Sequence, residues 1–355
     1  MPSVATGDAV VAQGDETIPL TMTEPLAIQR FDRRRPLGAL VLGRAGMDLY
    51  PAESGGKIEE AASFTSDVGG SAGNIAVALA RLGVKVGLLS TLSEDPVGRF
   101  VRRRLNALGV DTRYVRSVPG DPRTSLAFAE VRAEDCEVTI YRNNAADLQL
   151  TLDESLGASV AEASALIVTG TALVAEPSRS ATLALLAAAR AADTVTIFDL
   201  DYRAYAWRSR AETAAVYGEA AALSDLIVGN AEEFAVFAED GDGEAAAAAL
   251  TAEAGRGVLL KRGVGGASLL TAGARMDSGI FPVTALKPYG AGDAFMGGLV
   301  AALLTDASPE DAIRQGSAAA AVVVSRRGCA SAMPDTAELT AFLSSHRMTR
   351  NPTRT

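Results

Sequence analysis

Short apolar runs alternate with longer amphipathic or alanine-rich runs along most of the chain. The apolar runs have the length and continuity of buried β-strands, and they lie at residues 37–43, 85–92, 164–170, 194–201, 225–230 and 257–263. The runs between them are helix-like and lie at 73–83, 96–109, 178–192, 211–223 and 243–254. Apolar strands joined by helices are typical of parallel sheets covered on both faces. The pattern therefore predicts an α/β fold with a doubly wound, mainly parallel sheet flanked by helices.

Two stretches break this rhythm. Residues 57–70 hold a strand-like run with no room for a helix, and residues 123–143 read as two alternating strands joined by a turn. Together they predict a small extra β-sheet that would act as a lid over a site at the strand ends; the alternative is an edge hairpin without a function. The polar, aperiodic ends, 1–35 and 346–355, are expected to be flexible tails on one domain at 36–345.

The charge balance argues against two classes of partner. The 355 residues carry a net charge of −10 without an extended basic stretch, whereas nucleic-acid binding needs clustered Lys and Arg to neutralise phosphates. We therefore expect no nucleic-acid partner, although a local arginine pair can still bind a small anion. No run approaches the roughly 20 apolar residues of a membrane span, so no membrane association is expected.

The chain is poor in the residues of several common active sites. Its two cysteines, Cys136 and Cys329, are far apart, and its only histidine, His346, lies near the C-terminus. We therefore expect no disulfide framework, no cysteine zinc site and no Ser-His-Asp or Cys-His catalysis. Acid–base chemistry must come from carboxylates, Lys or Tyr, and a reducing cytoplasmic location is the expected one.

The stretch KPYGAGDAF at 287–295 joins an apolar, strand-like run to a run with helical spacing. Gly290, Ala291 and Gly292 would form a turn into the helix N-terminus. Free backbone N–H groups converge there and the helix dipole adds positive charge, which predicts an anion site. Asp293 has two readings of equal weight. It is an N-terminal acid that complements the dipole, or a general base that stays ionised near neutral pH and accepts a hydroxyl proton.

Several motifs together carry a family resemblance. DVGGSAGNIAVALARLG (67–83), VGNAEEF (228–234), LLKRGVGGASLL (259–270) and YGAGDAF (289–295) occur in this order. The chain resembles the ribokinase-like (PfkB-type) carbohydrate kinase family over roughly residues 37–340. The resemblance implies a doubly wound domain with a small β lid, and transfer of the γ-phosphate of ATP to a sugar hydroxyl with the help of Mg²⁺.

The resemblance also implies roles for residues on the nucleotide side. The glycine turn would hold the transferring phosphate, and Asp293 would take the proton of the sugar hydroxyl. Asn230 and Glu233 match an N-x-x-E pattern that organises magnesium, indirectly through water, and the phosphates. Taken alone, Glu233 reads better as a first-turn helix acid. Lys261 and Gly263 end a predicted strand where relatives bind the nucleotide.

On the sugar side, Asp48 follows the first predicted strand, where its carboxylate can accept two hydroxyl hydrogen bonds. Gly69, Gly70 and Asn74 belong to the glycine block of the first motif, and the resemblance implies that bare backbone approaches the sugar there. Asn74 could equally cap the following helix. We therefore take these four residues as candidates for binding the sugar.

Three arginines lie close to predicted strand ends: Arg44, Arg142 and Arg203. A neutral sugar does not need them, whereas a sugar acid calls for a bidentate guanidinium; the alternative for each one is a surface arginine. GRAGMDLYP, YRNNAADLQL and DLDYRAYAW are similar to the 5-dehydro-2-deoxygluconokinase branch of the family. That branch phosphorylates the 6-hydroxyl of a keto-deoxy sugar acid in myo-inositol catabolism. The alternatives are a 2-dehydro-3-deoxygluconokinase, a fructokinase-like enzyme, or a non-catalytic sugar or nucleotide sensor.

One departure from the family pattern concerns the residues before the glycine turn. Many members carry Asp-Thr there, and that Asp helps to bind a monovalent cation, whereas this chain has Lys287, Pro288 and Tyr289. A lysine would oppose or replace a potassium ion, so we predict no strict potassium dependence. The lid strands of relatives often pair, and the apolar SLAFAEV stretch at 125–131 permits a homodimer through the lid.

Overall fold

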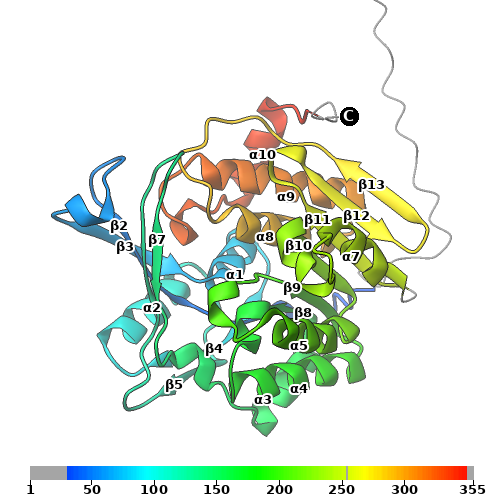
Figure 1. Ribbon diagram of the computed structural model, residues 1–355, viewed down its shortest axis with the longest axis horizontal. Helices are drawn as coiled ribbons and strands as arrows, with labels where there is room; N and C mark the ends of the chain where they lie inside the picture. The colour runs from blue at the N-terminus through cyan, green and yellow to red at the C-terminus, as the bar shows by residue number, and fades with distance from the viewer. Residues whose placement is uncertain (1–29, 253–254, 350–355) are drawn as a thin grey trace, which may run out of the picture.

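A computed structural model describes residues 30–252 and 255–349. Its centre is a nine-stranded sheet in the order β13-β12-β11-β10-β9-β8-β1-β4-β5 (Figure 1). All neighbouring strands pair in parallel except at one edge, where β12 pairs antiparallel with both β11 and β13. They span Leu37–Leu42 (β1), Val86–Ser93 (β4), Val115–Val118 (β5), Ala163–Thr169 (β8), Val195–Asp199 (β9), Leu226–Asn230 (β10), Gly257–Lys261 (β11), Ala267–Thr271 (β12) and Ala274–Ser278 (β13). The predicted mainly parallel sheet is confirmed.

Two hydrophobic cores lie on opposite faces of this sheet. In β1, Ala39 and Val41 belong to one core with α1, α8 and α9, while Leu40 and Leu42 belong to the other with α4 and α5. Both faces need apolar residues, which explains why the strands read as continuous apolar runs. The helices are α1 (Ser71–Arg81), α2 (Pro96–Ala107), α3 (Glu154–Ser159), α4 (Ser178–Ala191), α5 (Arg210–Ala222), α6 (Ala231–Phe234), α7 (Gly243–Ala249), α8 (Ala291–Leu303), α9 (Pro309–Val324) and α10 (Thr336–Ser345).

A second sheet of four strands, which we call the lid, projects from one side of the molecule (Figure 1). Its order is β3-β2-β6-β7, with β2 at Gly46–Pro51, β3 at Phe64–Gly69, β6 at Leu126–Ala129 and β7 at Val138–Tyr141. Three of these strands fall inside the predicted lid segments. The sequence did not predict β2, because its residues GMDLYP lack the long apolar run of a core strand. In consequence Asp48 lies on a lid strand rather than in a loop.

The apolar run 279–286 before the glycine turn is not a strand, which corrects the sequence-based expectation. Within the described residues it forms only an isolated bridge between Ile280 and Thr349. Pro282 has no N–H to donate to a ladder. The segment instead crosses from β13 to the start of α8 as irregular chain.

Most of the two predicted tails lies outside the described residues. At the N-terminal side, Phe31 is buried and Arg35 donates to the carbonyl of Ala163 at 2.8 Å. Near the C-terminus, Thr349 exchanges backbone hydrogen bonds with Ile280. The domain therefore makes contacts beyond residues 36 and 345. No helix in the described ranges combines the length and the apolar character needed to cross a bilayer.

Candidate active site

A cavity of about 940 Å³ lies at the carboxyl ends of the parallel strands, where open α/β sheets usually bind ligands. Strands β9, β10 and β11 end at residues that line it: Asp199, Asn230 and Lys261. Helices α1, α8 and α9 and lid strands β6 and β7 form its other walls. Of the predicted site residues, all except Gly69 and Arg142 line this cavity.

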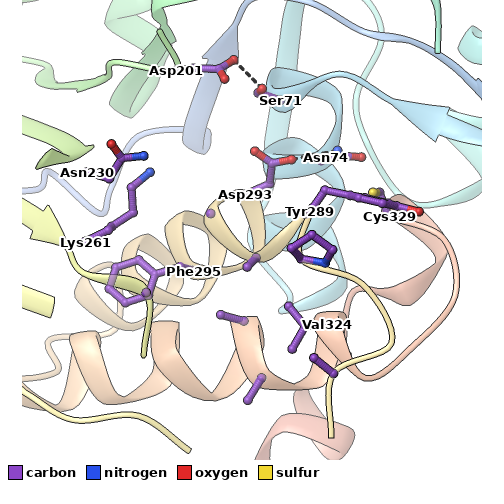
Figure 2. Close-up of a pocket in the computed structure, with 18 of the residues that line it drawn as sticks. Ser71, Asn74, Asp201, Asn230, Lys261, Tyr289, Asp293, Phe295, Val324 and Cys329 are labelled. Atoms are coloured by element: carbon purple, nitrogen blue, oxygen red, sulfur yellow. Dashed lines mark hydrogen bonds between the residues drawn. The ribbon is translucent and has the colours of Figure 1, made fainter. Parts of the chain in front are cut away.

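Asp293 is the third residue of α8 and lies at the centre of the site, between Asn74 and Lys261 (Figure 2). Asn74 Nδ2 donates a hydrogen bond of 2.8 Å to Asp293 Oδ2, while the buried Asn74 Oδ1 has no partner among the described residues. Burial, together with the nearby Asp201 carboxylate, raises the pKa of Asp293 to about 7. The carboxylate is therefore not fully ionised at neutral pH, contrary to our expectation, because the site removes it from water.

The turn before α8 has little room for side chains. Gly290 precedes the helix with φ of 82°, and a Cβ on it would lie 3.2 Å from Cys329 Sγ and 3.4 Å from Lys287 Nζ. A Cβ on Gly292 would lie 3.4 Å from Lys261 Nζ. The first N–H groups of α8 have no helical acceptor, and the residues that carry them line the cavity. This is the arrangement expected of an anion site, and we call the turn the anion cradle below.

Lys261 brings a positive charge to the cradle. Its Nζ lies 3.4 Å from Asp199 Oδ1 and 3.9 Å from Glu233 Oε2. Burial opposes the charged ammonium, but the Asp199 and Glu233 carboxylates outweigh it and raise the pKa of Lys261. Burial raises the pKa of Asp199. The sequence analysis missed Asp199, although an acid at the end of an apolar strand was a usable signal.

Asn230 and Glu233 form a capping box at the start of α6. Asn230 Oδ1 accepts from the Glu233 N–H at 2.9 Å, and Glu233 Oε2 accepts from the Asn230 N–H at 2.8 Å. The N-x-x-E pattern thus has a structural role in addition to any ligand role. Both residues also line the cavity, as does Gly263, which follows β11 with φ of 54°.

A second carboxylate that the sequence analysis missed is Asp201, just after β9. Its backbone has a positive φ of 35°, and Ser71 Oγ of α1 donates to its Oδ2 at 2.5 Å (Figure 2). Arg203 pairs with its other oxygen at 2.6 Å. Asp201 therefore fixes the position of Arg203 at the cavity edge and contributes to the raised pKa of Asp293.

The sugar-side candidates come from the lid and the glycine block. Asp48 is buried on β2, and Tyr50 OH donates to its Oδ2 at 2.9 Å. Burial raises the pKa of Asp48. A Cβ on Gly69 would lie 1.7 Å from Asp48 Oδ1, so Gly69 makes room for this carboxylate and does not itself line the cavity. Gly70 caps α1 with φ of 87° and does line it.

The three candidate arginines lie in different surroundings. Arg44 is buried, lines the cavity and donates to Ser125 Oγ at 3.2 Å. Arg203 lines the cavity with its side chain half exposed. Arg142 does not line it: the guanidinium forms an ion pair with the buried Asp147 and donates to a backbone carbonyl of the domain. The structure thus brings two of the three arginines to the site.

Lys287 is fully buried beside the glycine turn. Its Nζ donates to the Tyr289 carbonyl at 2.7 Å and lies 4.7 Å from the centroid of the Tyr289 ring. Burial lowers the pKa of Lys287. The ammonium therefore sits against the backbone that leads into the anion cradle.

Comparison with known proteins agrees with this geometry. The family model described as pfkB family carbohydrate kinase matches residues 38–336, and the chain belongs to this family. It is a carbohydrate kinase with a ribokinase-like fold, and kinases of this class use ATP. Within the family, it is 41% identical to the 5-dehydro-2-deoxygluconokinase of Photobacterium profundum, over 84% of this chain and 92% of that protein.

Two solved structures share the fold. The PfkB protein from Polaromonas sp. JS666 superposes with a TM-score of 0.75 at 26% identity, over 86% of this chain and 99% of that chain. The aminoimidazole riboside kinase from Salmonella enterica, solved with aminoimidazole riboside and an ATP analog, gives a TM-score of 0.72 at 25% identity over the same shares.

Proposed function

We propose that the enzyme transfers the γ-phosphate of ATP to the 6-hydroxyl of 5-dehydro-2-deoxy-D-gluconate, a step of myo-inositol catabolism in the cytoplasm. Curated relatives with this name are 36–41% identical over most of the chain. The observation that carries the proposal is that one cavity is lined both by Asp293, at the anion cradle, and by a buried arginine, Arg44. A neutral sugar would not need that buried guanidinium.

Asp293 acts as the general base in this reaction. Its carboxylate accepts the proton of the attacking hydroxyl as the hydroxyl oxygen bonds to the γ-phosphorus and the bond to the bridging β–γ oxygen breaks. ADP leaves with the electrons of that bond. A base with a pKa of about 7 is well matched to this transfer at neutral pH. Asn74 holds Oδ2 of the base, which orients the carboxylate.

The turn at Gly290–Gly292 would hold the transferring phosphate through backbone N–H groups, and Lys261 would neutralise part of its charge. The position of the Lys261 ammonium supports this role, because it lies 3.4 Å from where a Cβ of Gly292 would be. Gly263, at the mouth of β11, leaves space for the nucleotide. Alignment and charge compensation are the main requirements of phosphoryl transfer.

Magnesium fits this donor set in an outer-sphere manner. Among the described residues no group of three or more His, Cys, Asp or Glu is placed to hold a metal by itself. Mg²⁺ commonly keeps several waters and binds through phosphates and one or two carboxylates. Glu233 and Asn230 would hold it through water, and the ion would neutralise charge on the ATP phosphates. Lys261 limits closer approach, because its ammonium already occupies the space between Asp199 and Glu233.

The sugar would lie between the lid and the glycine block. Asp48 would accept hydroxyl hydrogen bonds through the oxygen that Tyr50 leaves open, and Gly70 and Asn74 would line the sugar pocket. Arg44 and Arg203 are the candidates for the substrate carboxylate. We do not propose that Arg142 contacts the substrate, because its guanidinium is already paired with Asp147; it instead ties the end of lid strand β7 to the domain.

Lys287 supports the absence of strict potassium dependence. Its ammonium donates to the Tyr289 carbonyl just before the cradle, so it supplies the positive charge that a monovalent cation would otherwise bring to that oxygen. We expect less than a several-fold change in turnover when sodium replaces potassium. A larger gain with potassium would contradict this part of the proposal.

The lid also offers a surface for self-association. Val138 and Tyr141 of β7 are 46% and 57% exposed, although both are large hydrophobic residues. We propose that the lids of two copies pair into a homodimer. Light scattering after size exclusion checks this, and a monomer at micromolar concentration would contradict it.

The proposed substrate is tested by an ADP-release assay over a panel of acceptors. The panel contains 5-dehydro-2-deoxygluconate, 2-dehydro-3-deoxygluconate, fructose, ribose and a nucleoside. We expect the highest kcat/KM with the first. Preference for 2-dehydro-3-deoxygluconate would move the assignment within the sugar acids, and preference for fructose would refute the arginine argument. Absence of turnover with every acceptor, with ATP still bound, would favour a sensor.

A further inference from the structure

Tyr289, the residue immediately before Gly290, is held at its backbone, its ring and its hydroxyl. Its carbonyl accepts from Lys287 Nζ at 2.7 Å. Its ring lies parallel to that of Tyr50, with centroids 6.3 Å apart and an interplanar angle of 4°. Its hydroxyl donates to the carbonyl of Glu130 at 2.7 Å. The first contact belongs to the catalytic turn, and the other two belong to the lid.

Glu130 is itself a junction of the lid. It follows β6 directly and is buried, and its carboxylate accepts from the backbone N–H groups of Ile58 at 3.0 Å and Glu137 at 3.1 Å. These two residues lie in the loops that precede β3 and β7. A hydrogen bond to the Glu130 carbonyl therefore attaches Tyr289 to a point that several lid segments share.

Tyr50 extends the connection to the sugar side. Its hydroxyl donates to Asp48 Oδ2, the proposed acceptor of sugar hydroxyls, while its ring stacks on Tyr289. Tyr50 and Tyr289 pack together with Ala129 and Val131 in a small apolar cluster separate from the two main cores. A movement of the lid strands must therefore move or break the contacts of Tyr289, which leads directly into the phosphate-binding turn.

We propose that Tyr289 is a positioning residue that couples the lid to the anion cradle. With the lid in place, the hydroxyl and ring hold Tyr289, and the chain enters Gly290 in the conformation that points the N–H groups of α8 at the phosphate. When the lid moves away, this constraint on the cradle is released. Phosphate transfer is thereby favoured when the lid covers the sugar and excludes water. The inference rests on the kinase activity and not on which sugar is the substrate.

The test is Tyr289→Phe, which removes the hydrogen bond to Glu130 and keeps the aromatic ring. The matched control is Tyr114→Phe, which also removes one tyrosine hydrogen bond, the 2.7 Å bond from Tyr114 OH to Glu162, but lies outside the lid and the turn. Hydrogen exchange of the ligand-free protein is measured first, because it does not depend on activity. We expect Tyr289→Phe to speed exchange about 3- to 10-fold, the loss that one hydrogen bond predicts, in the lid and in the segment 289–293 together. Tyr114→Phe should leave both unchanged.

Kinetics provide the second readout. Tyr289→Phe should lower kcat more than it changes the KM for ATP, and should raise the ratio of ADP to sugar phosphate above that of the wild type, because water reaches the cradle more often. Faster exchange in the lid alone, with an unchanged product ratio, would overturn the coupling. If the wild type turned over none of the sugars, the proposed function would fail, and joint exchange in both segments would still decide for or against the coupling.

Discussion

The two lysines that flank the catalytic turn lie in opposite surroundings. Lys261, at the end of β11, is shared between the Asp199 and Glu233 carboxylates, which raise its pKa against the effect of burial. Lys287, on the other side of the turn, is fully buried against a carbonyl and an aromatic ring, and burial lowers its pKa. The same side chain thus has two environments within one site.

This difference indicates different roles: the Lys261 ammonium is available to a ligand in the cavity, whereas the Lys287 ammonium contacts the protein's own backbone. Lys261 lines the cavity, so its ammonium can contact an incoming phosphate as well as its two carboxylate neighbours. Lys287 is directed at the protein's own chain and has no solvent exposure. We therefore expect Lys261 to act on ATP binding and Lys287 on the shape of the turn.

The largest effect should come from the carboxylate between the two lysines. Asp293→Asn keeps the size of the side chain and removes the base, so turnover should fall by about 10²- to 10⁴-fold. ATP binding, measured by calorimetry, should remain, because both lysines and the cradle are unchanged. Glu232→Gln, at an exposed position, is the matched control. Near-normal turnover in Asp293→Asn would remove Asp293 from the mechanism.

Replacing Lys261 tests its expected role in ATP binding. Lys261→Met should raise the KM for ATP by about 10- to 100-fold, because one charge-assisted contact to phosphate is lost. It should also destabilise the protein, because Asp199 and Glu233 lose their shared cation. Lys85→Met, at an exposed position, controls for the loss of a lysine. An unchanged KM for ATP would mean that Lys261 serves only its carboxylate neighbours.

Replacing Lys287 tests its expected role in the shape of the turn. Lys287→Ala leaves the Tyr289 carbonyl without its donor, so kcat should fall about 5- to 10-fold while the KM for ATP changes little. The vacated space faces a carbonyl oxygen, and potassium should therefore restore more activity than sodium. A loss confined to ATP affinity would make the two lysines equivalent and would break the comparison.

The smallest effect concerns stability and pH. The pKa of Asp293 is about 7 in the folded protein, above the usual value of 3.8 for an aspartate, so the folded state favours the protonated form. The cost of ionising it in the folded state is therefore absent at low pH and complete above pH 7. Asp293→Asn should raise Tm by about 2 °C or more at pH 8, and the gain should shrink as the pH falls toward 4. A gain independent of pH would assign the effect to packing instead.

The fold could be predicted largely from the sequence because its strands are buried on both faces. A strand such as β11 reads as one apolar run, which located its end near Lys261. The nucleotide role of Lys261 came from the family resemblance. Strand β2 was missed, since GMDLYP alternates and belongs to a small sheet with little core. Asp201 was missed as well, although it comes just after the apolar strand β9, where an acid was a usable signal.

Contacts between distant segments were beyond the reach of sequence patterns. Arg142 was a reasonable carboxylate candidate until the structure placed its guanidinium against Asp147. The bond between Tyr289 and Glu130 joins residues 159 positions apart, and no local spacing predicts it. The pKa of Asp293 likewise depends on Asp201, which approaches it only in the folded chain.

The alignment of strand ends has a consequence for insertions and deletions. Asn230 and Lys261 are register partners, and each is the last residue of its strand. A single residue added inside β11 would exchange its two faces and also shift Lys261 out of line with Asn230. Length changes in this part of the sheet would thus harm packing and catalysis at once, whereas the exposed connection at 239–242 lies away from this register and should accommodate them.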